Sequence, residues 1–168
     1  APDGEATAEA VLSELPAGVV AADPLGRPLF AANRSVGSFD DPVEQLWQHC
    51  TTLREHRGDG HVATLAAHGI DGCEAHLLLL AEHGTPIEVV FDHRGWSEGD
   101  RLAAMDRLRD RGLLTPGAAL ALTDAGRRIR HEIEDTTDRL AAAPLVAALG
   151  VDGAAGLVDS LTAAATAV

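Results

Sequence analysis

A length of 168 residues fits one domain, and a hydrophobic content of 46% is enough for a core. The formal net charge of −13 repels nucleic-acid phosphates unless the arginines, which account for all the basic residues except histidine, gather on one face. Cys50 and Cys73 do not resemble a secreted disulfide framework, and neither a signal peptide nor a bilayer-long apolar run is evident. We therefore expect a cytoplasmic protein that does not bind a membrane.

The N-terminal segment should form an arm. Residues 5–15 favour a helix that Pro16 ends. Pro, Gly, Asn and Asp recur through residues 16–41, which predicts a loop-rich stretch with one short helix. Phe30 and Phe39 are the expected anchors of this arm against the main body.

A longer helix should follow Asp41, its N-cap, and break at Gly58. Its apolar residues recur at helical spacing, with Trp47 on the apolar face, which is expected to be buried. Asp59 is then placed to cap a further helix over residues 61–67.

The next three helices each carry a cap or a proline at their start and a glycine at their end. They are expected from Asp71 to Gly84, from Pro86 to Gly95 and from Ser97 to Gly112. Residues 113–123 then predict two short strands around a Thr-Pro-Gly turn. A long helix should follow to about Ala143, with Pro144 as a boundary before a last Ala-rich helix.

The predicted elements follow the order of a winged helix-turn-helix, which is helix, short helix, helix, strand, turn and strand. Residues 108–114 and 120–127 resemble the MarR family, in which a Leu-Thr-Asp-Ala-Gly run leads from the wing to a dimerisation helix. The resemblance covers about residues 72–140. It implies a mainly α fold with a two-stranded wing and long C-terminal helices. The expected domains are an arm over residues 1–41, a MarR-like winged helix over 42–144 and a C-terminal helix over 145–168.

A closer resemblance is to the C-terminal half of an actinobacterial group of MarR-like proteins of unassigned function. The matching stretches are residues 27–33, 53–63 and 94–97. This resemblance implies a missing N-terminal domain. A homodimer is a separate prediction, because Ile129, Ile133 and Leu140 give the late helix an apolar stripe that should need a partner.

The expected recognition helix departs from that of a DNA reader. In a MarR-like regulator the start of this helix enters the major groove, and an arginine on the wing reaches the minor groove. Here the helix opens with Glu98 and Asp100, and residues 115–119 of the wing contain no basic residue. We therefore expect no nucleic-acid partner.

The densest polar stretch, residues 54–61, is the candidate site. His56 and His61 are candidate catalytic residues, since histidine exchanges protons near neutral pH. Glu55, Arg57 and Asp59 are candidate ligand-binding residues, and the guanidinium of Arg57 offers a fork for a carboxylate. The alternative is a buried structural network in which the same groups pair with one another.

Trp96 is expected to anchor the core at a helix junction and is also a candidate ligand contact. Seven of the eight histidines lie between His49 and His93, but none has the close spacing of a zinc motif, so neither a metal nor a cofactor is predicted.

Three functions remain open. The first is a small-molecule-binding or metabolic enzyme domain on a MarR-like scaffold that has lost its DNA-binding features. The second, which is the main alternative, is a ligand-responsive, DNA-binding transcriptional regulator of MarR type. The third is a purely structural dimerisation domain. Whether any reaction is catalysed is left open by the sequence.

Overall fold

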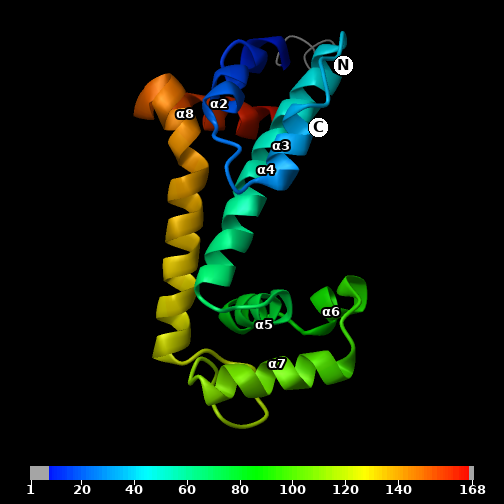
Figure 1. Cartoon of the computed structure of the whole chain (residues 1–168), viewed down its shortest axis with the longest axis vertical. Helices are drawn as coiled ribbons and strands as arrows, with labels where there is room; N and C mark the ends of the chain where they lie inside the picture. The colour runs from blue at the N-terminus through cyan, green and yellow to red at the C-terminus, as the bar shows by residue number, and fades with distance from the viewer. Residues whose placement is uncertain (1–7, 167–168) are drawn as a thin grey trace. The chain divides into compact units, whose positions relative to one another are not determined.

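The computed structural model describes residues 8–166 and is built almost entirely from helices (Figure 1). Residues 8–12 are helical, so the start of the helix expected over residues 5–15 lies outside the described range. The remaining helices are α2 (Leu15–Ala21), α3 (Pro28–Arg34), α4 (Pro42–Ala67), α5 (Gly72–His83), α6 (Glu88–Arg94), α7 (Glu98–Asp110) and α8 (Asp124–Thr166).

The chain divides into two compact units. The first comprises Ala1–Val62 with Thr137–Val168, and the second is Ala63–Thr136. Helices α4 and α8 each contribute residues to both units. Within the first unit, the arm and the end of α8 share one core. The expected division into an arm, a winged helix and a C-terminal helix stays a prediction.

The core of the first unit contains Val11, Leu15 and Leu157, with partly buried leucines of α4 and α8 packed against it. Pro16 opens α2 rather than ending a helix, since proline is tolerated in the first turn, where amides have no helical partner. The arm therefore holds two short helices beyond residue 14. Phe30 is fully buried as expected, whereas Phe39 remains 39% exposed.

Helix α4 runs without a break through Gly58 and Gly60, so the helix end predicted at Gly58 was wrong. Neither glycine has a positive φ; the first such glycine after α4 is Gly69, with φ 63°. Asp41 caps the start as predicted, because its Oδ1 accepts hydrogen bonds from the amides of Val43 and Glu44 at 2.8 and 3.1 Å.

In the second unit, the caps predicted for α5 and α7 are confirmed. Asp71 and Glu74 form a capping box at the start of α5, and Ser97 and Asp100 form one at the start of α7. Gly84 and Gly95 end α5 and α6 in the left-handed conformation. Leucines of α5 and α7 meet in a core that also includes Phe91, Met105 and Ile133.

The predicted two-stranded wing is wrong. Among residues 8–166 no β-strand forms, and residues 113–123 contain one isolated antiparallel bridge, between Leu114 and Leu122. The amide of Thr115 donates to the carbonyl of Ala121 at 2.9 Å, but the pairing goes no further. Pro116, the next residue, has no amide hydrogen to donate, and Gly117 adopts φ 103°, so the ladder cannot extend.

Helix α8 continues through Pro144 and changes direction at Gly150, where φ is 73° and ψ is 173°. Its Ile129 and Ile133 pack within the second unit's own core, so that part of the stripe needs no partner chain. The homodimer stays a prediction.

An 18-residue stretch of α8 is also apolar enough to cross a membrane by length and composition, with mean hydropathy 1.7, which the sequence analysis did not anticipate. Leu145, Leu149 and Leu157 of α8 pack in the first unit, but only a small share of the apolar stretch is buried.

Candidate functional site

Residues 54–61 form two consecutive turns in the middle of α4, not a helix junction. Within the first unit, His56 and Asp59 are 3% and 8% exposed and lie against α3. A ligand in solvent has no open route to either side chain. This arrangement favours the structural interpretation for both residues.

Asp59 caps α3 rather than the helix that follows it in sequence. Its Oδ2 accepts a hydrogen bond at 2.9 Å from the amide of Phe30, the third residue of α3. Arg27, the residue before α3, supplies no side-chain cap of its own. Asp59 therefore supplies, from α4, an acceptor that the N-terminus of α3 lacks.

The ring of His56 packs edge-on against the ring of Phe30, with centroids 5.1 Å apart. Burial lowers the pKa of His56, the Arg27 guanidinium lowers it further, and the Asp59 carboxylate opposes both effects. The ring is therefore neutral near pH 7. Because it is enclosed, its predicted role as an acid or base is not supported by the geometry.

Arg27 completes this network. Its Nη1 donates to the backbone carbonyl of His56, and the guanidinium lies against α4 at Gly60. A Cβ at Gly60 would lie 2.6 Å from Nη1 of Arg27, whereas a Cβ at Gly58 would meet only the Glu55 carboxylate, at 3.7 Å. A side chain at Gly60 would therefore require the Arg27 guanidinium to shift, whereas one at Gly58 would not.

The other predicted residues point elsewhere. Arg57 forms an exposed ion pair with Asp138 at 3.1 Å, and Nδ1 of His61 is 3.0 Å from Oγ1 of Thr137. Glu55 pairs with the neighbouring Arg54 at 2.6 Å. Trp96 belongs to the second unit, where its Nε1 donates to His76 at 3.4 Å. Within the first unit, the five predicted residues of α4 therefore have different partners and do not form one site.

The histidines also remain dispersed. Across residues 8–166, no three side chains of the His, Cys, Asp or Glu type come close enough to hold a metal ion. Burial lowers the pKa of His49 and of His76, with Arg94 as a second cause at His76. Both rings therefore lose their charge at a lower pH than an exposed histidine would.

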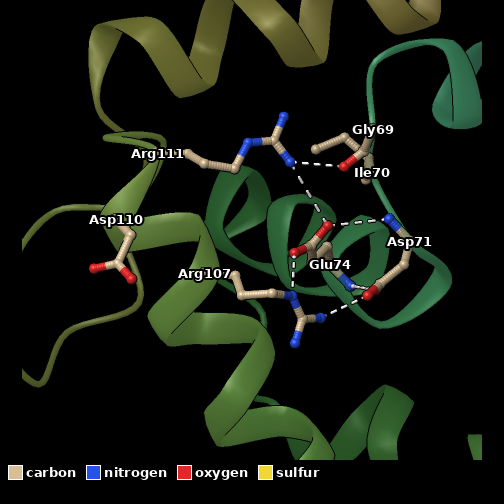
Figure 2. A pocket seen from close by; sticks show the side chains of 7 residues that line it. All are labelled: Gly69, Ile70, Asp71, Glu74, Arg107, Asp110 and Arg111. Carbon is tan, nitrogen blue, oxygen red and sulfur yellow. Dashed lines mark hydrogen bonds and ion pairs between the residues drawn. The ribbon is translucent and has the colours of Figure 1, made fainter.

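A different polar cluster lies in the second unit, in an open hollow of about 560 Å³ between the start of α5 and the end of α7 (Figure 2). Arg107 reaches across from α7: its Nε donates to Glu74 at 2.8 Å and its Nη2 to Asp71 at 2.5 Å. These carboxylates raise the pKa of Arg107, and the main cause is the hydrogen bond that Arg107 donates to Glu74. Asp71 and Glu74 are the capping-box residues of α5.

Arg111 lies on the opposite wall of this hollow. Its Nη1 and Nη2 donate to the carbonyls of Gly69 and His68 at 2.7 and 2.9 Å. Asp110, the last residue of α7, is exposed and directs its carboxylate away from both arginines (Figure 2). This cluster was not among the predicted sites, although the capping-box spacing and two arginines four residues apart are visible in the sequence.

The remaining arginines of α7 are also used internally. Arg101 pairs with Glu98 at 3.5 Å, and Arg109 binds Asp106 at 3.2 Å and the carbonyl of Gly117 at 2.8 Å. Hydrogen bonds from the Ser97 hydroxyl and amide lower the pKa of Asp100, so the helix begins with a firmly anionic carboxylate. The start of α7 is therefore acidic.

Two short-range features relate α6 to α7. One is the short link of three residues between the two helices, and the other is the left-handed conformation of its first residue, Gly95, which has φ 71°. A three- or four-residue turn with a glycine is typical of a helix-turn-helix. A helix-turn-helix family model matches residues 1–168. The chain belongs to this helix-turn-helix family. No curated protein and no solved structure matches it in the other two comparisons.

Within this helix-turn-helix family member, α7 occupies the position of the recognition helix, and α5 supports it through their shared core. Fold membership alone does not establish DNA binding, because function depends on the side chains that the scaffold presents.

Proposed function

We propose that this chain is a helix-turn-helix scaffold that does not recognise duplex DNA and instead binds a small polar molecule. The supporting observation is the use of the α7 arginines inside the protein, together with Glu98 and Asp100 at the helix start. Contacts from Lys and Arg to phosphates provide most of the affinity of such proteins. A helix whose arginines already bind carbonyls and carboxylates of the same chain has few arginines left for phosphates.

The hollow beside Arg107 is the best-supported binding site for the small molecule. Three carboxylates and two arginines line it, which leaves one formal negative charge, and Ile70 adds an apolar surface. Asp110 stands at the C-terminal end of α7, where the helix dipole disfavours a carboxylate. A cationic ligand would offset both the negative charge of the hollow and the unfavourable position of the Asp110 carboxylate. We therefore infer that the ligand is an amine with an apolar body, and that it is bound without being chemically altered.

The alternative is a ligand-responsive DNA-binding regulator, and membership in a helix-turn-helix family is the observation that favours it. A closer relationship to MarR-like or actinobacterial proteins stays a prediction, based on residues 120–127 and the other matching stretches.

DNA binding can be tested by fluorescence anisotropy with duplexes from the protein's own upstream region. At physiological salt we expect no binding tighter than about 10 µM, within the usual range for non-specific contacts. Glu98→Arg should increase the affinity, because it replaces an exposed carboxylate at the helix start with a cation. Salt-sensitive nanomolar binding by the unmodified protein would instead establish the regulator.

The small-molecule site can be tested with two probes of equal length and opposite charge, butylammonium and butyrate. Amide NMR shifts at Gly69, Asp110 and Arg111 should respond to butylammonium and not to butyrate, because the hollow is net negative. Asp110→Asn should reduce this response without lowering stability, since Asp110 is exposed. Equal shifts with both probes, or an unchanged response in Asp110→Asn, would place the site elsewhere.

A further inference from the structure

A second surface lies in the first unit, at the start of α4. Phe39, Val43, Glu44, Trp47 and Gln48 line an open depression of about 370 Å³, the Trp47 hollow. Trp47 is 75% exposed and Val43, one helical turn before it, is 52% exposed. The expectation that Trp47 is buried on an apolar face was therefore wrong. Leu46, Cys50 and Leu53 face the unit's core instead.

The hollow is preformed by hydrogen bonds beneath it. The amide of Phe39 donates to Oε1 of Gln45 at 2.7 Å, which holds the preceding loop on α4. Nε2 of Gln48 donates to the carbonyl of Asn33 at 3.0 Å, which joins the same helix to the end of α3. Because these contacts already order the backbone, a partner would bind here without first folding the site.

The one charged residue among those that line the hollow is Glu44, which is negative. The neighbouring residues Asp40 and Asp41 are exposed. An exposed tryptophan within such a rim attracts a cation as well as an apolar group. A second copy of this chain fits poorly, since a two-fold contact would bring identical carboxylates together, and each chain carries a net charge of −13.

We propose that the Trp47 hollow docks a segment of another protein that carries an apolar anchor side chain flanked by Lys or Arg. Its volume is near the low end of ligand sites, roughly 300 Å³ and above, so it has room for one or two large side chains rather than a folded surface. The exposed apolar residues supply the contact area, and the carboxylates select a basic partner. This surface belongs to the first unit and does not depend on the net-negative hollow beside Arg107, which belongs to the second.

The test uses two labelled amphipathic helical peptides that share a leucine face and carry either Lys or Glu elsewhere. Anisotropy should show binding of the Leu/Lys peptide only. Trp47→Ala should weaken it at least tenfold, and Glu44→Gln should weaken it severalfold. Leu25→Ala, which removes an 84% exposed leucine of the same unit, is the matched control and should leave the affinity unchanged.

Equal binding of the Leu/Glu peptide, or equal weakening in Leu25→Ala, would show general hydrophobic adsorption and overturn the proposal. Light scattering tests whether a second copy of the chain occupies the surface instead. A dimer that Trp47→Ala dissociates would assign the surface to that second copy and would also overturn the proposal. Trp47 is so exposed that its replacement should leave the melting temperature nearly unchanged, which separates loss of docking from loss of fold.

Discussion

Gly126→Ala should destabilise the second unit by about 3 kcal/mol or more, because the new methyl group would collide with backbone rather than with a movable side chain. A Cβ at Gly126 would lie well inside 3.0 Å of the carbonyl oxygen of Leu113, and 3.1 Å from its carbon. The carbonyl of Leu113 also accepts the amide of Thr123 at 3.0 Å, so moving it breaks a hydrogen bond. Chemical denaturation followed by circular dichroism measures the change.

The matched control is Gly156→Ala, also in α8. Nothing lies within 4 Å of the position that a Cβ would take at Gly156, and the residue is exposed. Alanine should therefore stabilise the helix there by up to about 1 kcal/mol, through its better helix propensity. If Gly126→Ala proved as stable as Gly156→Ala, the close packing of residues 113–123 on α8 would be refuted.

The sequence predicted the Leu-Thr-Asp-Ala-Gly stretch as a helix start, but not why each residue is needed. Thr123 provides the cap, since its Oγ1 accepts the amide of Gly126 at 3.0 Å and donates to the carbonyl of Gly112 at 2.6 Å. The glycine is required by a contact with Leu113, and that contact becomes visible only once both segments are placed. Local capping signals are predictable, whereas such close approaches are tertiary.

The same distinction explains the correct and incorrect predictions elsewhere. The caps at Asp71 and Ser97 use residues within one turn, and they were confirmed. The break at Gly58 was wrong, because His56 and Asp59, which lie on one turn of α4, are buried against Phe30 of α3, which favours an intact helix. Propensity suggested a turn at this glycine, and tertiary contact decided against it.

Exposure is the other property that sequence periodicity does not determine. Trp47 fits the apolar stripe of α4 by spacing, yet the leucines one and six positions away occupy the core and leave the indole in solvent. The stripe of α8 shows the opposite case, since Ile133 was expected to need a partner and is fully covered by its own unit. A spacing pattern identifies an apolar face without identifying what covers it.

Asp59→Ala should destabilise the first unit by about 1–3 kcal/mol, the usual cost of leaving a buried backbone donor without its acceptor. Asp59 is 8% exposed, and its carboxylate accepts the amide of Phe30. The loss should also loosen α3, so hydrogen exchange at the amide of Phe30 should accelerate together with the fall in melting temperature.

Two controls on α4 distinguish this structural role from a functional one. Arg57→Ala removes an ion pair whose two side chains are both exposed, so it should change the stability by less than about 1 kcal/mol. Gly58→Ala should be neutral or stabilising, whereas Gly60→Ala should destabilise by displacing the guanidinium of Arg27 from the carbonyl of His56. If Asp59→Ala kept the melting temperature of the unmodified protein, the buried network would not hold α3, and a functional role for this corner would regain support.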